Sequence, residues 1–194
     1  MFQLPGYLPY HITRNSKPHG GVSVFISKEF QSEQIQDLTV INENIEINTV
    51  KITTNFTSYF VCTIYRPHSK HINVEEFTNT LFTLLNNRIK NKKVIITGDL
   101  NINLLEHTTH QPTNNFLTTL QTINFIPHIS RPTRFPDGAN LGEPSLLDHI
   151  YTNFNSNFTS GILHFPISDH LPIFINIKIP QETKKIPSNP VQRF

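Results

Sequence analysis

Hydrophobic and polar positions alternate along several short segments of the chain, with the period of two that is typical of β-strands. Residues 45–53 follow this alternation strictly. Residues 59–65 are instead apolar almost throughout, as expected for a strand that is buried on both faces. The segments expected to be strands are 21–27, 45–53, 59–65, 93–98, 145–152, 161–164 and 171–177.

Two segments have the period of an α-helix. In residues 73–89, Phe77, Leu81, Leu85 and other apolar residues fall on one face, and Asn73 with Glu76 three positions later forms an N-terminal capping pattern. Residues 113–122 predict a second, weaker helix. Residues 131–144 are rich in Pro and Gly and predict a loop. Few helices among strands of both kinds indicate two β-sheets packed face to face with helices outside.

Composition limits the classes of protein to which the chain can belong. At 194 residues, one domain with a sizeable core is expected, here residues 1–179, followed by a flexible tail over 180–194. The net charge of +2 is too small for a protein that coats DNA, but it does not exclude an enzyme that grips a few phosphates. No apolar run is long enough to cross a membrane.

The single cysteine, Cys62, lies in the apolar run 59–65 and is expected to be buried and inert. No signal peptide is recognisable. Both observations favour a nuclear or cytoplasmic protein that is not secreted.

Three short segments place polar groups where predicted strands begin or end. They are Gly98-Asp99-Leu100-Asn101, Ser145 to Ile150, and Ser168-Asp169-His170. Side chains at strand ends are held rigidly and can converge on one point. Carboxylate and amide oxygens suit a hard divalent cation, and an imidazole can transfer a proton or donate to a phosphate oxygen.

At these segments the chain resembles the endonuclease/exonuclease/phosphatase superfamily, and within it the endonuclease domain of non-LTR retrotransposons. The similar segments occur in family order over nearly the whole chain. They are Pro5-Gly6-Tyr7, residues 20–26, Ile64-Tyr65-Arg66-Pro67, residues 95–101, Pro132-Thr133-Arg134, residues 145–150 and residues 168–170. The resemblance implies a four-layer α/β sandwich of two mixed sheets flanked by helices.

The resemblance also implies roles for individual residues. Asp99 would orient or deprotonate the attacking water, and Asn101 would contact the phosphate. Asp148 would pair with His170 and hold its tautomer, so that His170 acts as a phosphate-binding acid. The remaining implied roles are a phosphate contact for Tyr65, metal ligation of Mg²⁺ or Mn²⁺ by Asp169 and Asp99, and substrate binding by Thr133, Arg134 and Asn101.

Simpler structural explanations exist for several of these residues. Asp99 and Asn101, expected on one side of an extended segment, could instead form a Gly-Asp turn. Asp148 could be a buried carboxylate bonded to backbone, and Arg134 a solvated loop residue. His149 is expected to pack outward without a chemical role. Ser145 is not expected to be a nucleophile, because the chain has no Gly-x-Ser-x-Gly elbow.

The resemblance is incomplete at the front of the chain. In the family, an Asn and the principal metal-binding Glu stand on strands that precede the segment similar to Pro5-Gly6-Tyr7. Glu29 and Glu33 follow that segment and do not match it. We therefore expect a domain that lacks its first strands, with weakened metal binding.

The sequence thus predicts a metal-dependent phosphodiesterase that nicks DNA and derives from a non-LTR retrotransposon. The alternative is an inactive remnant that at most binds nucleic acid weakly. A phosphatase or lipid phosphodiesterase on the same fold is a third possibility. The expected partners are DNA and, in the parent element, a reverse transcriptase domain. Neither a membrane nor a small-molecule cofactor is expected.

Overall fold

The computed structural model describes residues 3–14, 20–68, 73–136, 142–165 and 168–179. Its centre is a seven-stranded mixed sheet, in which only β6 and β7 run parallel and the other neighbours are antiparallel. The strands follow the order β3 (Gln31–Gln34), β5 (Glu46–Thr53), β6 (Ser58–Tyr65), β7 (Lys93–Asp99), β9 (Asp148–Thr152) and β8 (Ile126–Pro127), and β4 (Val40–Ile41) also pairs with β5.

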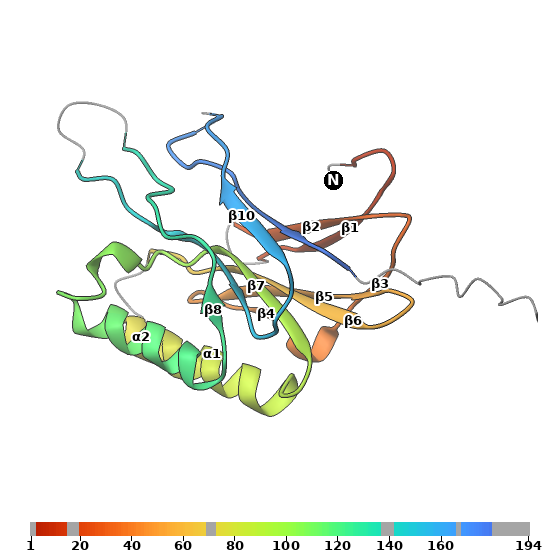
Figure 1. Ribbon diagram of the computed structural model, residues 1–194, viewed down its shortest axis with the longest axis horizontal. Coiled ribbons are helices and arrows are strands. Elements are labelled where there is room, and N and C mark those ends of the chain that lie inside the picture. The colour runs from red at the N-terminus through yellow and green to blue at the C-terminus, as the bar shows by residue number, and fades with distance from the viewer. Residues whose placement is uncertain (1–2, 15–19, 69–72, 137–141, 166–167, 180–194) are drawn as a thin grey trace, which may run out of the picture.

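Helices cover one face of this sheet and two small sheets lie over the other (Figure 1). The helices are α1 (Val74–Arg88) and α2 (Gln111–Thr122), and the described residues also form the short 3-10 turns η1 (Gln36–Leu38) and η2 (Leu104–Glu106). One small sheet pairs β1 (Tyr7–Ile12) with β2 (Val22–Ser27), and the other pairs β10 (Phe158–Ile162) with β11 (Ile173–Ile177). The predicted α/β sandwich is confirmed.

The helix α1 forms as its sequence predicts. The Asn73 side chain accepts a hydrogen bond from the backbone N–H of Glu76, which caps the first turn. Phe77, Leu81 and Leu85 are buried in the main core with the apolar side chains of β6 and β7. Phe77 also approaches Phe116 of α2 at 6.1 Å between ring centres, so that the two helices share one core.

The strand β5 is buried on both faces, although its sequence alternates. Glu46 to Val50 are all buried, because β1 and β2 pack over the polar side of the strand. The Asn48 side chain donates to the carbonyl of Tyr10 at 2.8 Å and accepts from the Gln34 side chain at 2.8 Å. Buried polar groups of this kind are tolerated because they are hydrogen-bonded, and here they fix the small sheet on the large one.

Some boundaries differ from the prediction. The strand expected at 161–164 is β10 at Phe158–Ile162, and that expected at 145–152 begins only at Asp148. The sequence pattern missed β1, β3, β4 and β8. The strand β3 has no apolar residue, and β4 and β8 have two residues each, so none produces a readable period. The predicted tail at 180–194 lies outside the described residues.

Cys62 is buried, and burial raises the pKa of its thiol to about 11 despite a hydrogen bond from Thr49 that opposes the rise, as expected for an inert thiol. No helix in the described ranges has the length and apolar character needed to cross a bilayer.

Candidate active site

The register of the central sheet brings three candidate residues together. Asp99, the last residue of β7, pairs directly with Asp148, the first residue of β9. Residues that face each other in an antiparallel pair project on the same side of the sheet. The backbone N–H of Arg66 donates to the carbonyl of Asp99 at 2.9 Å, so the end of β6, with Tyr65, lies beside Asp99.

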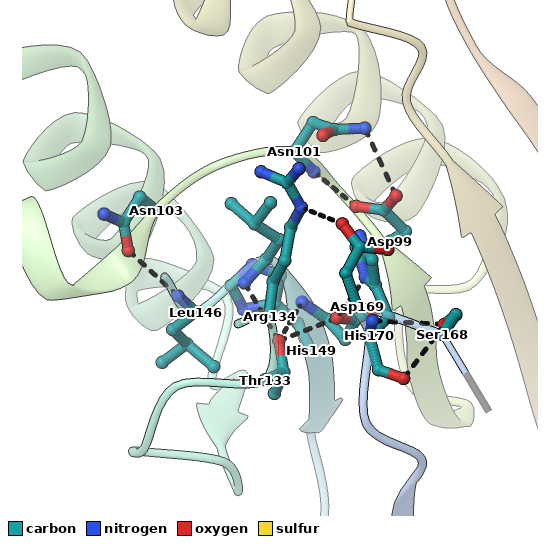
Figure 2. A network of polar contacts seen from close by, with 12 residues as sticks. Asp99, Asn101, Asn103, Thr133, Arg134, Leu146, His149, Ser168, Asp169 and His170 are labelled. Atoms are coloured by element: carbon teal, nitrogen blue, oxygen red, sulfur yellow. Dashed lines mark hydrogen bonds and ion pairs between the residues drawn. The ribbon is translucent and has the colours of Figure 1, made fainter. Parts of the chain in front are cut away.

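Asp148 and His170 are hydrogen-bonded, as predicted. Figure 2 shows the polar network to which His170 belongs. The distance from His170 Nδ1 to Asp148 Oδ2 is 2.8 Å. The same carboxylate oxygen accepts a hydrogen bond of 2.7 Å from the Thr133 hydroxyl. Ser168 closes the turn before His170, because its hydroxyl accepts from the His170 backbone N–H and donates to the His170 carbonyl. The imidazole is therefore held in orientation, with Nε2 left for another partner.

Arg134 and Asp169 form the second polar pair of the site. Arg134 Nε donates to Asp169 Oδ2 at 2.8 Å, and the two side chains are 38% and 35% exposed. This hydrogen bond is the first cause that lowers the pKa of Asp169. Isolated antiparallel β-bridges pair the backbone of Arg134 with that of Ser145 and that of His170, and they hold Arg134 in place. Arg134 is thus an anchored residue of the site and not a freely solvated one.

Asp99 and Asn101 lie together but not on an extended segment. Asn101 has a φ of 49°, in the left-handed region, so the chain turns at this point. Asp99 Oδ1 accepts from the Asn101 backbone N–H at 3.0 Å, and the Asn101 amide donates to the Arg66 carbonyl at 2.7 Å. The expectation of an extended segment is wrong, because the carboxylate and amide stabilise a turn that still directs both side chains to the site.

The surroundings of Asp99 raise the pKa of its carboxyl above the ordinary value. Burial raises its pKa first, and the nearby Asp148 charge also raises it, while the hydrogen bond from the Asn101 backbone and the charges of His170 and Arg134 act in the other direction. A carboxylate with a raised pKa is a better proton acceptor than an exposed one.

Most predicted residues line a single cavity of about 670 Å³. Tyr65, Asp99, Asn101, Arg134, Asp169 and His170 all contribute to its wall. Asp148 stands behind His170, and Thr133 is fully buried behind Asp148. Thr133 is predicted to bind substrate, but its buried hydroxyl donates a hydrogen bond to the Asp148 carboxylate.

The sequence did not predict several other residues of the cavity wall. His68, Glu106, His110 and Glu143 also line it. They lie in loops and turns, and only the spatial arrangement reveals them. Asn103 has a supporting role, because its side-chain oxygen accepts from the Leu146 backbone N–H at 3.0 Å and fastens the loop after Asn101 to the strand segment before Asp148.

The expectation for His149 is wrong. Its side chain is 1% exposed and Nε2 lies 3.0 Å from the carbonyl of Ile102. Burial lowers the pKa of His149 to about 4, although the hydrogen bond to Ile102 opposes the shift. In β9, His149 points to the side opposite Asp148, and this side is the core under the helices and not solvent.

The side chains of the site suit a hard divalent cation. Ligand atoms of Asp99, Asp148 and His170 all lie within 4.8 Å of one another. Asp169, predicted as a ligand with Asp99, is outside this group and is engaged by Arg134. Oxygen ligands are those that Mg²⁺ prefers, and a cation would relieve the repulsion between the Asp99 and Asp148 carboxylates. The residues present therefore fit the ion.

Carboxylates and an imidazole that converge at the strand ends of an α/β sandwich suit the hydrolysis of phosphate esters. A family model described as the endonuclease/exonuclease/phosphatase family matches residues 2–170. The chain belongs to this family, whose members include nucleases and phosphatases. No curated protein sequence matches the chain significantly.

Solved structures show the same fold at low sequence identity. The endonuclease domain of TRAS1, a telomere-specific non-LTR retrotransposon, is 14% identical with a TM-score of 0.71, over 92% of this chain and 83% of that one. A mannosyl-6-phosphatase of Bacteroides thetaiotaomicron is 16% identical with a TM-score of 0.63, over 91% and 78%. D. rerio TDP2, complexed with a single-strand DNA product, is 15% identical with a TM-score of 0.60, over 88% and 76%.

Proposed function

We propose that this chain is a divalent-metal-dependent phosphodiesterase that nicks DNA, derived from the endonuclease domain of a non-LTR retrotransposon. The observation that carries the proposal is the bonded group of Thr133, Asp148 and His170 beside Asp99, at one wall of the cavity. The similarity to the TRAS1 endonuclease domain supports DNA as the substrate and a retrotransposon as the source.

In the proposed reaction, each of these cavity residues has a separate role. Asp99 accepts a proton from a water molecule. The water oxygen then forms a bond to phosphorus while the bond from phosphorus to one bridging oxygen breaks, and that oxygen leaves with the bonding electron pair and takes up a proton from solvent. His170, oriented by Asp148, donates from Nε2 to a non-bridging oxygen of the phosphate.

Arg134 and Tyr65 complete the phosphate site. Arg134 uses Nε for Asp169, and within the described residues its two terminal nitrogens have no partner, so they can meet a phosphate oxygen. Tyr65 contributes its hydroxyl from the end of β6. A Mg²⁺ or Mn²⁺ ion on Asp99 and a neighbouring carboxylate, Asp148 or Asp169, would polarise the phosphate and stabilise the departing oxygen.

The proposal includes a partner and a place of action. A DNA-cutting domain of this type would act in the nucleus or cytoplasm, and a reverse transcriptase domain is its candidate partner in the parent element.

The alternative function is an inactive domain that binds nucleic acid weakly. One observation favours it, since the group of Asp99, Asp148 and His170 within the described residues has no glutamate.

Conversion of supercoiled plasmid to nicked circles tests the proposal. A closed circle has no chain ends, so only cleavage of an internal phosphodiester produces the nicked form. We expect nicking by the unmodified chain in Mg²⁺, none in EDTA, and a loss of about 10²-fold or more in Asp99→Asn, which cannot accept the proton.

The matched control is Asp37→Asn, because Asp37 is an exposed carboxylate of the 3-10 turn η1, away from the cavity. It should nick as fast as the unmodified chain. Nicking that survives in Asp99→Asn would point to a contaminating nuclease and overturn the proposal. Binding of DNA without any nicking would establish the inactive alternative.

A further inference from the structure

A buried ion pair lies behind the active site. Arg14 Nε contacts Glu46 Oε1, and the two side chains are only 11% and 0% exposed. The other carboxylate oxygen, Oε2, accepts a hydrogen bond of 2.7 Å from the Gly21 backbone N–H. Both oxygens of Glu46 are therefore engaged, at a depth where charges are costly. Neither Arg14 nor Glu46 lines the active-site cavity or has a role in the proposed reaction.

The register of the central sheet aligns Glu46 with residues of the active site. Glu46 of β5 pairs directly with Tyr65 of β6, and Asp99 of β7 pairs directly with Asp148 of β9. The register of the parallel strands β6 and β7, followed to their ends, places Tyr65 beside Asp99. Residues that face each other on neighbouring strands project on the same side of the sheet. One row of side chains thus crosses four strands, and its members are Glu46, Tyr65, Asp99 and Asp148.

Tyr65 stands in this row between two carboxylates. Its hydroxyl forms no hydrogen bond with another described residue, so the position of the ring depends on the groups at its sides. Directly opposed residues on antiparallel strands have Cβ atoms about 4.5–5.5 Å apart, which places Glu46 next to Tyr65. Because Arg14 and Gly21 hold Glu46 from two directions, this side of Tyr65 is a fixed wall.

The charge of Arg14 also affects the substrate. An unpaired carboxylate at Glu46 would repel a phosphate that approaches the Tyr65 hydroxyl, since charges interact strongly where water is excluded. The guanidinium of Arg14 cancels this charge inside the protein. The phosphate then meets only the carboxylates that take part in the reaction.

We propose that Arg14 and Glu46 are positioning residues for Tyr65. The pair holds the phenol where its hydroxyl meets the phosphate, and it neutralises the carboxylate beside that hydroxyl. The proposal rests on the phosphodiesterase function and adds to it two residues outside the cavity wall. A merely structural pair would only fasten the β1–β2 sheet to the central sheet.

The test uses a variant that removes both charges. Arg14→Met with Glu46→Gln, the uncharged pair, leaves an amide oxygen that can accept from the Gly21 N–H, and neutral replacements of a buried ion pair often preserve stability. We expect plasmid nicking in Mg²⁺ to fall about tenfold, because a displacement of roughly 1 Å near the reacting atoms can cost about 10²-fold. The same change in a Tyr65→Phe background should cause no further loss.

Asn48→Ala is the matched control. Asn48 is also buried on β5 and donates to the Tyr10 carbonyl, but its partner on β6 is Thr63. It fastens the same small sheet without standing next to Tyr65. Any loss of nicking in Asn48→Ala should be the same factor with tyrosine and with phenylalanine at position 65.

A second readout does not depend on cleavage. The chain contains five tyrosines, and after their replacement by fluorotyrosine the fluorine NMR line that disappears in Tyr65→Phe belongs to Tyr65. In EDTA and without DNA, we expect this line to move toward the position of free fluorotyrosine in the uncharged pair, because the ring is no longer held. Asn48→Ala should leave the line in place.

Arg14→Lys serves if the uncharged pair does not fold. It keeps the charge but loses the rigid planar group, and we expect a smaller loss of nicking that again disappears in the Tyr65→Phe background. The proposal is overturned if the folded variant nicks as fast as the unmodified chain, if its loss is equal in both backgrounds, or if the Tyr65 line stays in place. A Tyr65 line that moves as expected in a chain that never nicks plasmid would retain the positioning and overturn the phosphodiesterase function.

Discussion

Asp148 connects the chemistry of the site to the interior of the protein. Its Oδ2 oxygen accepts from the buried Thr133 hydroxyl and lies 2.8 Å from His170 Nδ1. The Thr133 hydroxyl also accepts from the backbone N–H of Leu147 and of Asp148 itself, at 3.2 and 3.1 Å. The position of His170 therefore depends on a chain of contacts that begins at a residue without access to substrate. Substitution of such a supporting partner typically lowers metal affinity or activity by roughly 10- to 100-fold.

The protonation of His149 is coupled to the stability of the fold. Because burial lowers its pKa to about 4, the unfolded chain binds a proton between pH 6.5 and 4 that the folded chain does not. The contribution of neutral His149 to stability is thus present above pH 6.5 and is lost as pH falls toward 4. Over that window the loss amounts to about 3 kcal/mol.

The variant His149→Gln removes this titration and retains a side-chain amide that can donate to the Ile102 carbonyl. We expect the free energy of unfolding in urea to fall less between pH 7 and pH 4.5 in His149→Gln than in the unmodified chain. The exposed His164 provides the control, because His164→Gln should follow the unmodified curve. Parallel curves for all three proteins would show that His149 takes up its proton in the folded state.

The sequence indicates which types of residue form the site. It predicts their arrangement in space only in part. Asp99, Asp148, Asp169 and His170 stand at the ends of recognisable strands, and the need of a buried Asp for a partner predicted the bond from Asp148 to His170. The turn at Asn101 could not be predicted from spacing, because a short polar segment is compatible with an extended or a left-handed residue. The orientation of His149 depends on which face of β9 the helices cover.

At the scale of elements, the junction of β6 and β7 determines where Asp99 lies. Gly98 has a φ of 135°, and a Cβ atom added there would lie 1.9 Å from the carbonyl oxygen of Ile64. The parallel pairing of β6 with β7 requires this close approach of backbones just before Asp99. Glycine is the residue that permits both the backbone angle and the contact.

We therefore expect Gly98→Ala to destabilise the fold by roughly 2 to 6 kcal/mol, from backbone strain and overpacking together. Gly142 is the matched control, because its φ is 101° but an added Cβ would meet nothing within 4 Å. Gly142→Ala should lose only the strain part. The urea midpoints of the two variants measure the difference, and equal midpoints would contradict the argument.

The long elements could be predicted from periodicity because packing reinforces their local preferences. The capped helix α1 and the strands β5, β6 and β7 appear where the pattern places them. The short strands could not be predicted, since β4 and β8 exist only through pairing with β5 and β9. Their residues have no pattern of their own, and the partner strand supplies the hydrogen bonds.

In the whole molecule, the central sheet separates a helical core from a face covered by two small sheets (Figure 1). The candidate site lies where β6, β7 and β9 meet the loop that carries Asp169 and His170. The sequence predicted this sandwich through the resemblance of its motifs. It could not predict that Glu46, on β5, is fully buried and paired with Arg14, because that contact depends on how the β1–β2 sheet is placed.

We propose that Asp148 and His170 act as one unit in the cleavage of DNA. The most direct measurement is the rate of plasmid nicking in Mg²⁺ for the unmodified chain, Asp148→Asn, His170→Gln and the double variant. Residues that act as a unit are non-additive. We predict that each single variant loses about 10²-fold, and that the double variant is no slower than His170→Gln. Losses that multiply in the double variant, or an unmodified chain that does not nick, would contradict the account.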